Sequence, residues 1–258
     1  MLLLHGLLAS SDSFGRAFDA PAANGCTVAV PDLLGFGRSR SPGETAFTIE
    51  RHLETLDEVA ERLGLLDGPL VVAGHSLGGV LAIEWAARHA GAVERVVTWG
   101  APLHPDRRDA VAAIAGLGLM ERLFALDTRS AEAACRLVCR YRRTARLVAV
   151  LASPQLPVAV SRRAVDHTWP AYQGAMEEIV LSASWPDAVR RLDDHGVRTV
   201  LVRGEADRIV DGAVYAGLAE EHDAVDVLVR PGAGHLLPLT DAPWAAGLLD
   251  PSAAGSRP

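Results

Sequence analysis

Residues 70–79 read LVVAGHSLGG, and this stretch decides the fold because it joins a short apolar run to a helical pattern. Ser76 lies at the junction, with Gly74 two residues before it and Gly78 two residues after it. A sharp turn from strand to helix lifts a serine hydroxyl clear of a sheet, and small neighbours avoid collisions with the adjoining backbone. The following helix directs its first amide groups toward an anion formed nearby. Gly-x-Ser-x-Gly alone is a weak signal, but its place between a strand and a helix makes Ser76 the candidate nucleophile.

A serine hydroxyl needs a base that removes its proton, and the base needs a group that orients it. His235 ends the segment PGAGH after one apolar run, and Asp207 ends the segment GEAD after the preceding run. Taken alone, an aspartate in a glycine-rich turn is usually a cap, and a histidine beside glycine is usually a surface residue. Together, in the order Ser, Asp, His and each just beyond a predicted strand, they predict a catalytic triad of Ser76, Asp207 and His235.

Short apolar runs alternate with helical patterns on both sides of this stretch. Runs this short and continuously apolar are typical of strands in a parallel sheet that is covered on both faces. The predicted strands are Leu2–Leu4, Thr27–Val30, Leu70–Ala73, Val93–Trp99, Thr199–Val202 and Val225–Val229. Amphipathic helices are predicted at Ile49–Leu63 and Leu77–His89. The alternation predicts an α/β fold with a mostly parallel sheet flanked by helices.

The alternation stops between residues 105 and 185, which are helical in composition. Because strands return afterwards, we interpret residues 105–185 as a helical insertion in one domain, whose core consists of residues 1–104 and 186–258. Within the insertion, Cys135–Leu151 is arginine-rich on one face and apolar on the other. Such a helix can bind a membrane surface, but a surface helix with solvated or paired arginines is the commoner case and is favoured here.

Composition excludes several classes of function. The chain has 258 residues and a formal net charge of −7, whereas proteins that bind nucleic acid usually have a basic face, so the charge argues against a nucleic acid partner. No apolar run is long enough to span a bilayer. The three cysteines, Cys26, Cys135 and Cys139, have no metal-binding pattern and are expected to be small buried side chains, which predicts a reducing, cytoplasmic location. No phosphate-binding glycine pattern follows a strand, so we expect no nucleotide, no other cofactor and no metal.

The sequence resembles the α/β-hydrolase superfamily over nearly its whole length. The matching pieces are LHGL at residues 4–7, PDLLGFGRS at 31–39, GHSLGG at 74–79, GEADRIV at 204–210 and GH at 234–235. The resemblance implies an α/β-hydrolase fold, a helical lid at residues 105–185 and an oxyanion hole formed by the backbone N–H groups of Leu7 and Leu77. It assigns no catalytic role to Asp32 or Arg38, which we expect to be structural.

The resemblance also implies the activity of a serine esterase. Such an enzyme forms an acyl-enzyme from its substrate, here a small apolar or aromatic acyl compound. Candidate walls of the substrate pocket are the side chains of Phe14, Trp99, Trp169, Tyr172 and Met176, although core packing is the commoner role for such residues. Similar sites cleave carbon–carbon bonds of diketone-like ring-fission products, and a non-catalytic binding protein on the same scaffold is a further alternative. A serine nucleophile argues against the branches that resemble haloalkane dehalogenases and epoxide hydrolases.

The beginning of the sequence departs from this family. The resemblance implies two strands before Leu2–Leu4, the second of them beside Thr27–Val30, and neither is present. An apolar sheet edge left unpaired favours aggregation. We therefore expect a misassigned start, with about 20 to 30 further residues encoded upstream that hold two strand patterns. The alternative is a degenerate remnant that folds poorly.

Overall fold

A parallel sheet forms the centre of the molecule in the computed structural model, which describes residues 1–23, 25–40, 43–44, 46–117 and 128–250. Across these residues the sheet has five strands in the order β1-β2-β3-β4-β5, and each neighbouring pair is parallel. The strands are β1 (Leu2–Leu4), β2 (Leu70–His75), β3 (Val93–Trp99), β4 (Arg198–Gly204) and β5 (Val225–Arg230). All five lie within two residues of their predicted bounds. The predicted α/β architecture is therefore confirmed.

Thr27–Val30 is the predicted strand that does not form. Ala29 forms a parallel bridge to Leu2: its N–H donates to Met1 O at 2.9 Å, and its carbonyl accepts from the Leu3 N–H at 2.9 Å. The Met1 amino group also donates to Thr27 O at 2.6 Å. This one bridge is the extent of the strand pairing, so the segment does not count as a strand. The chain thus lies beside one edge of β1 at Ala29 and returns along the other edge as β2. In open α/β sheets, ligands bind beyond the carboxyl ends of the strands at such a reversal of strand order.

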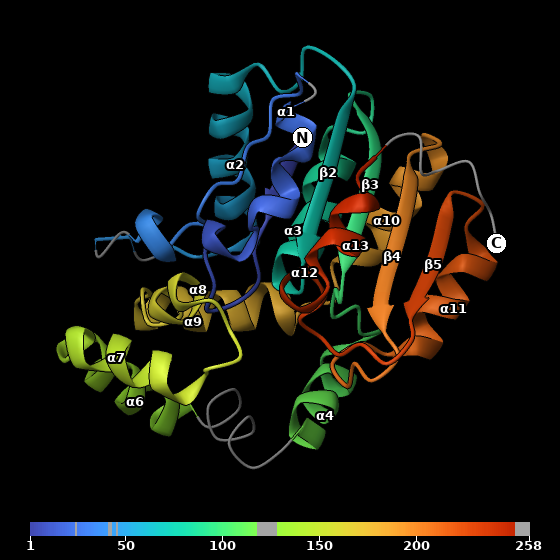
Figure 1. Ribbon diagram of the computed structural model, residues 1–258. Helices are drawn as coiled ribbons and strands as arrows, with labels where there is room; N and C mark the ends of the chain where they lie inside the picture. Colours follow the sequence, from blue (N-terminus) through green and yellow to red (C-terminus); the bar gives the residue numbers. More distant parts are fainter. Residues whose placement is uncertain (24, 41–42, 45, 118–127, 251–258) are drawn as a thin grey trace.

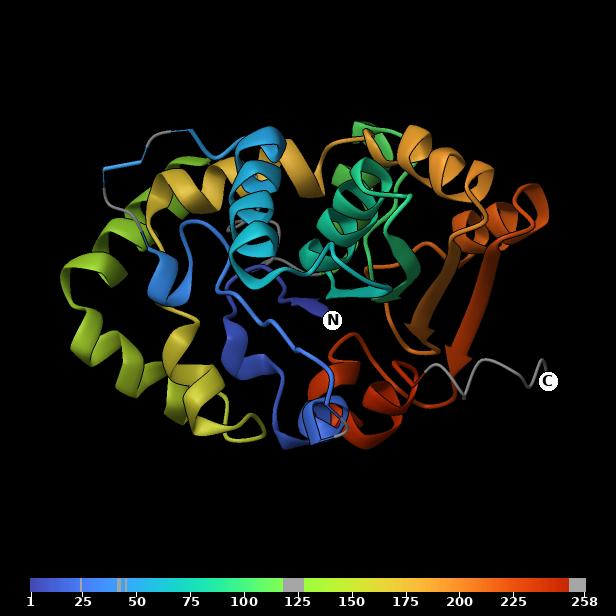
Figure 2. The same ribbon diagram turned by 90° about the horizontal axis from the view of Figure 1, so that it is seen from above.

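Helices cover both faces of the sheet, as Figures 1 and 2 show. One face carries α2 (Ile49–Leu63), α3 (Leu77–Arg88), α10 (Trp185–Asp194) and α11 (Gly212–Glu221). The other carries α1 (Ala20–Ala23), α12 (Leu237–Thr240), α13 (Ala242–Gly247) and the 3-10 turn Arg16–Asp19. Side chains alternate between the two faces along each strand, so Leu2 and Leu4 of β1 pack on the first face and Leu3 on the second.

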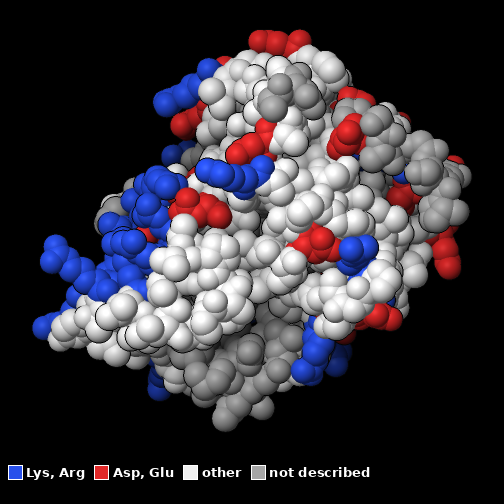
Figure 3. Space-filling view, viewed as in Figure 1, with Lys and Arg blue, Asp and Glu red and all other residues white. Residues whose placement is uncertain are grey.

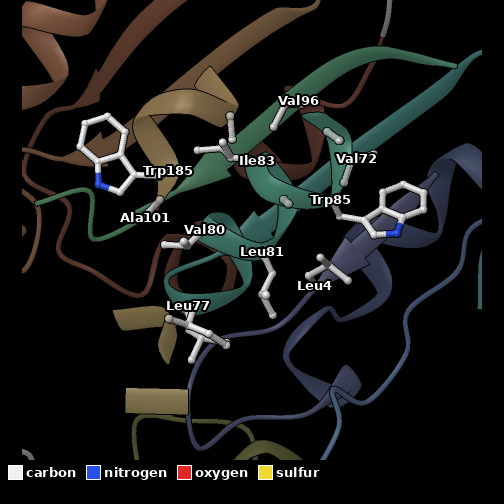
Figure 4. Close-up of a cluster of buried hydrophobic side chains, with 14 of the residues drawn as sticks. Leu4, Val72, Leu77, Val80, Leu81, Ile83, Trp85, Val96, Ala101 and Trp185 are labelled. Atoms are coloured by element: carbon white, nitrogen blue, oxygen red, sulfur yellow. The ribbon is translucent and has the colours of Figure 1, made fainter. Parts of the chain in front are cut away.

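Helix α3 is buried on nearly all sides. From Leu77 to Ala87, Glu84 is the one residue that is not buried. Figure 4 shows the apolar cluster around this helix, which includes Leu4 of β1 and Val96 of β3. A helix that is apolar all round is stable only inside a protein, and this packing fixes the helix against the sheet. Ser76, which immediately precedes α3, is thereby held at a fixed point above the sheet edge.

Residues 105–185 contain helices and, in the part that the structure describes, no strand. The helices lie beyond the carboxyl ends of the strands (Figure 1), and residues 118–127 of the predicted insertion lie outside the described residues. They are α4 (Arg107–Leu117), α6 (Thr128–Arg140), α7 (Arg142–Ala152), α8 (Val158–Arg163), α9 (Trp169–Ala175) and a π-helical turn at Met176–Val180. The helical pattern at Cys135–Leu151 is divided between α6 and α7, which are separated at Tyr141. The remaining 3-10 turns are Ser11–Ser13 and Gly37–Ser39.

The cysteines differ in their burial. Cys135 is buried and Cys139 is partly buried, as expected, whereas Cys26 is exposed in the turn after α1, which corrects the expectation for that residue. None of the helices in the described ranges combines the length and the apolar character that crossing a bilayer requires.

Candidate active site

Ser76 occupies a strained turn between β2 and α3. Its backbone has φ 53° and ψ −123°, a conformation that residues other than glycine rarely adopt. Two backbone hydrogen bonds hold it there: the Ser76 N–H donates to Trp99 O at 2.8 Å, and the Ser76 carbonyl accepts from the N–H of Gly79 at 2.8 Å. The predicted strand-to-helix turn is therefore present at the predicted residue.

The glycines around Ser76 are required by close backbone contacts. A Cβ atom on Gly74 would lie 2.0 Å from Gly78 O, and one on Gly78 would lie 2.3 Å from Leu4 O and 2.4 Å from His5 O. These positions are occupied by rigid backbone, so no rotamer change could make room. The sequence argument for small residues is confirmed at both positions.

Asp207 and His235 form a hydrogen-bonded pair. Asp207 follows β4, His235 follows β5, and the His235 Nδ1–H donates to Asp207 Oδ2 at 2.9 Å. The Asp207 side chain is 1% exposed, and its other oxygen accepts from the Ile209 N–H at 2.9 Å. Burial by itself would raise the pKa of the Asp207 carboxyl, but the hydrogen bonds and the charge of His235 lower the pKa below its ordinary value. The carboxylate is therefore ionised and suited to hold an imidazolium.

Two further residues, His75 and Gly100, support this pair, and the sequence reasoning assigned neither of them to the site. His75 is buried, and its Nε2–H donates to the His235 carbonyl at 2.9 Å. Burial, with the adjacent His235, lowers the pKa of His75 to about 3, so its ring is neutral. Gly100 follows β3 with φ +68°, and a Cβ atom there would lie 2.9 Å from the His235 ring. Only the glycine after Trp99 hints at this contact in the sequence.

Ser76 and His235 lie in the wall of the same cavity, whose volume is ≈ 530 Å³. Within the described residues no hydrogen bond joins the Ser76 hydroxyl to the His235 ring. Contacts between nucleophile and base are often long in a ligand-free site and shorten when substrate binds. The structure thus brings the three candidate residues to one place and joins two of them directly.

The two predicted oxyanion donors also lie in this region. Leu7 lines the cavity, and Leu77 is the first residue of α3. Neither N–H has an acceptor among the residues that the structure describes. The turn before Leu7 is fixed by His5, whose Nδ1–H donates to Gly6 O at 2.8 Å and whose Nε2 accepts from the Leu33 N–H at 2.9 Å. Free donors on a fixed turn and at a helix start are the arrangement that an oxyanion requires.

The cavity wall is mainly apolar. Its apolar side chains come from both the sheet edge and the helical segment: Leu7, Leu8, Ile114, Leu156, Val160, Tyr172, Met176, Val180, Ile209, Leu236 and Leu239. Two buried hydroxyls in the wall, Ser13 Oγ and Ser161 Oγ, have no hydrogen-bond partner within the described part of the chain. An apolar wall with a few polar atoms is typical of a site for a small organic ligand.

Of the five candidate wall residues, the structure places two at the cavity. Tyr172 and Met176 line it, and Trp169 stacks on Tyr172 with ring centroids 5.9 Å apart. Phe14 and Trp99 instead pack on the opposite face of the sheet, with ring centroids 6.2 Å apart. Phe14 and Trp99 therefore belong to core packing, which the sequence analysis named as the commoner role for such residues.

Asp32 and Arg38 lie away from the cavity wall. Asp32 accepts from the N–H groups of Ser11 and Arg38, each at 2.6 Å, and these bonds lower the pKa of its carboxyl although burial opposes them. The Arg38 side chain contacts Asp12 and Asp32. Both residues thus tie loops together. The described ranges contain no cluster of three or more side chains that could hold a metal ion.

Comparison with known proteins identifies the family. Residues 1–242 match the alpha/beta hydrolase fold family, so the chain belongs to that family. A probable lysophospholipase of Arabidopsis thaliana, BODYGUARD 4, is 24% identical over 247 residues, which are 91% of this chain and 59% of that protein. The chain therefore spans less than two thirds of the length of this curated relative.

Solved structures share the fold. An epoxide hydrolase of Vigna radiata, VrEH1, is similar with a TM-score of 0.71 and 17% identity, over 96% of this chain and 88% of that one. A carboxylesterase of Nitrososphaera gargenis has a TM-score of 0.65 and 17% identity, over 92% and 82% of the two chains. At these identities the likeness concerns the fold alone.

Proposed function

We propose that the chain is a serine hydrolase that cleaves a carboxylic ester, or a related acyl substrate, through an acyl-enzyme. One observation carries this proposal: His235, whose ring is hydrogen-bonded to Asp207, lines the same cavity as Ser76, which is held in a strained turn at the start of a helix. This is the arrangement that activates a serine hydroxyl. The names of a lysophospholipase and a carboxylesterase among the similar proteins agree with it.

In the proposed acylation step, Ser76 Oγ attacks the ester carbonyl carbon and its proton passes to His235 Nε2. The carbonyl oxygen becomes an oxyanion, which the N–H groups of Leu7 and Leu77 bind. Asp207 holds the imidazole through Nδ1 and stabilises the imidazolium. His235 then gives its proton to the leaving alkoxide, so that an alcohol departs and the acyl group remains on Ser76.

Deacylation repeats these steps with water. His235 takes a proton from a water molecule, the hydroxide oxygen attacks the acyl carbon, and the Ser76 oxygen leaves with that proton. A carboxylic acid is released and the hydroxyl of Ser76 is restored. In this proposal residues 105–185 form a lid, because side chains of α4, α7, α8 and α9 complete the cavity wall opposite Ser76.

The cavity suggests the substrate class. Its apolar wall fits an apolar or aromatic acyl group, whose burial contributes roughly 25 cal/mol for each Å² removed from water. The unpartnered hydroxyls of Ser13 and Ser161 would bind a polar substituent on that group, because a buried hydroxyl without a partner is unfavourable.

Labelling with a fluorophosphonate probe tests the proposal, because the probe reacts with activated serines. We expect the wild-type protein to be labelled and Ser76→Ala to be unlabelled. Ser153→Ala, which removes another hydroxyl from the same wall, is the matched control and should remain labelled. His235→Ala should reduce ester hydrolysis by about 10⁴-fold. A folded wild-type protein that resists labelling would contradict the proposal and favour a binding role.

A substrate screen separates the reaction classes. Aryl and alkyl esters of graded acyl length would be compared with diketone-like ring-fission compounds. Hydrolysis of esters alone is the expected result. Turnover confined to the diketones would identify carbon–carbon bond hydrolysis instead.

A further inference from the structure

The outer surface of α7 and α8 exposes large apolar side chains. Leu147 is 61% exposed, Val148 57% and Leu151 71% on α7, and Val158 at the start of α8 is 57% exposed. Leu151 follows Leu147 by four residues and Val148 by three, so these α7 side chains lie on one side of the helix. Single exposed apolar residues are ordinary, but several on adjoining helices mark an interaction site. We call this area the α7–α8 surface.

Arginines border the same apolar side chains. Arg143, Arg146 and Arg162 line a hollow of ≈ 500 Å³ between α7 and α8, together with Leu147 and Val158. Arg146 pairs with Asp166, whereas Arg143 and Arg162 are exposed and have no acidic partner within the described ranges. The guanidinium groups of Arg143 and Arg162 are therefore available to an anion outside the chain.

The charge of this region is opposite to that of the rest of the chain. Residues 128–163 contain eight arginines and one acidic residue, Glu132, so this segment carries +7 while the entire chain carries −7. Figure 3 shows basic side chains gathered on the side of the molecule where Figure 1 places α7 and α8, next to uncharged surface. Such an asymmetry directs a protein toward an anionic surface in one orientation.

The sequence alone favours solvated or paired arginines in this segment, but the structure places Arg143 and Arg162, which have no acidic partner within the described ranges, beside exposed apolar side chains. We therefore propose that the α7–α8 surface docks on an anionic lipid surface. The apolar side chains would enter the boundary between headgroups and acyl chains, and the arginines would bind the lipid phosphates. A second copy of this chain is disfavoured as the occupant, because a symmetric contact would bring the same unpaired arginines together. Apolar area and local positive charge are the two terms that together give stable binding at a membrane interface.

The surface lies directly outside the cavity. The other side of α7 contributes Ala149 to the cavity wall, and Ser153 and Leu156 follow in the turn that leads to α8. Docking would thus place a bilayer against the helices that enclose the candidate active site. This inference goes beyond the proposed reaction, because binding to lipid requires neither Ser76 nor turnover.

Vesicle co-sedimentation tests the proposal. Ser76→Ala protein, which cannot degrade lipid by the proposed mechanism, would be mixed with phosphatidylcholine vesicles or with mixed phosphatidylcholine and phosphatidylglycerol vesicles. We expect binding to the mixed vesicles that weakens at high salt, and little binding to phosphatidylcholine alone. When Arg143→Gln and Arg162→Gln are introduced together into the Ser76→Ala protein, its partition coefficient onto the mixed vesicles should fall on the order of 20-fold. Adding Leu147→Ser and Leu151→Ser should lower it at least about tenfold.

Leu63→Ser, at an apolar residue on α2 that is 50% exposed, is the matched control and should bind as before. Circular dichroism melting would confirm that each variant folds. Absence of binding to the mixed vesicles, or binding that neither pair of substitutions weakens, would overturn the proposal. So would a dimer in solution that is lost with Leu147→Ser and Leu151→Ser, because that result identifies a second copy as the occupant. Fluorophosphonate labelling of Ser76 is independent of all these outcomes.

Discussion

Ser76 adopts a left-handed backbone conformation because its neighbours impose it. Such a conformation costs about 1 to 3 kcal/mol for a residue other than glycine. The hydrogen bond to Trp99 O and the burial of α3 offset this cost. The close approach of Gly78 to the carbonyls of Leu4 and His5 completes the turn, so that strain at one residue is maintained by tight packing at others.

Substitution of Gly78 tests this dependence. Gly78→Ala would place a Cβ atom 2.3 Å from Leu4 O, which only a backbone shift can relieve. We expect a loss of about 3 kcal/mol in the free energy of unfolding, measured by urea titration, together with lost fluorophosphonate labelling. Gly91→Ala, where nothing lies within 4 Å, should change stability by less than about 1 kcal/mol. Equal stability of the two variants would refute the steric argument.

The sequence predicts the candidate triad better than it predicts the residues around it. Ser76, Asp207 and His235 each follow a strand, and strand ends can be found from local patterns. His75 and Gly100 act through contacts with His235 instead, and His75 is 160 positions away from it in the chain. No local period or turn signal encodes such a contact. These two residues could be assigned only once the strands had been brought side by side.

Asp166 connects several elements of the helical segment. Its carboxylate is 1% exposed and contacts Arg146 at 2.8 Å, Arg163 at 3.2 Å, Arg142 at 3.9 Å and Arg40 at 4.0 Å. One buried negative charge therefore compensates four positive ones, from α7, α8 and the loop that precedes α2. Removing it would leave the arginines to repel each other.

Asp166→Asn should therefore destabilise the protein by about 2 kcal/mol, less than for a fully buried pair because the arginines are partly exposed to solvent. Urea unfolding would measure the loss, and limited proteolysis should show faster cleavage between α6 and α9. Asp187→Asn, which removes an exposed carboxylate that pairs with Arg190 on α10, is the control and should cost less than about 1 kcal/mol. Indistinguishable unfolding curves would show that Asp166 does not hold the helices together.

The bounds of an element are predicted well where the sequence carries strong local signals for that element. Ile49–Leu63 is confirmed at both ends, because it has a strong amphipathic pattern, an N-cap at Thr48 and a left-handed glycine after its last residue. Thr27–Val30 is wrong as a strand because an apolar run does not show how far a neighbouring strand will pair with it, and only one bridge to β1 forms. The break at Tyr141 carries neither glycine nor proline, so no signal could locate it.

Buried histidines make the stability of the fold depend on pH. Burial lowers the pKa of His5 and of His52 to about 4, and that of His75 to about 3. The unfolded chain, with pKa values near 6.5, takes up protons first as the pH falls. Stability is therefore complete above pH 6.5 and is lost as the pH falls from there toward about 4, by up to about 1.4 kcal/mol per pH unit for each histidine.

His52 allows this dependence to be measured. Both of its ring nitrogens are buried and lack a partner within the described residues, so His52→Leu removes a group that favours the unfolded state in acid. Between about pH 7.5 and 5.5 this variant should lose about 1 kcal/mol less stability than the wild type, by urea titration at each pH. The exposed His195, changed to Gln, is the control and should follow the wild type. A steeper loss in His52→Leu would be the opposite of the expected sign.

The Trp185 indole N–H donates to the His104 carbonyl at 3.0 Å, and both residues are buried. This bond joins the two points at which the chain leaves and re-enters the sheet-bearing core. All five strands lie outside the segment between these points, and the segment contacts the core elsewhere as well, for example where the Gly37 N–H donates to Asp166 O at 2.8 Å. For the proposed hydrolase, we expect that exchanging these helices as one unit, with their contacts to the core retained, would change substrate selectivity while Ser76, Asp207 and His235 stay in place.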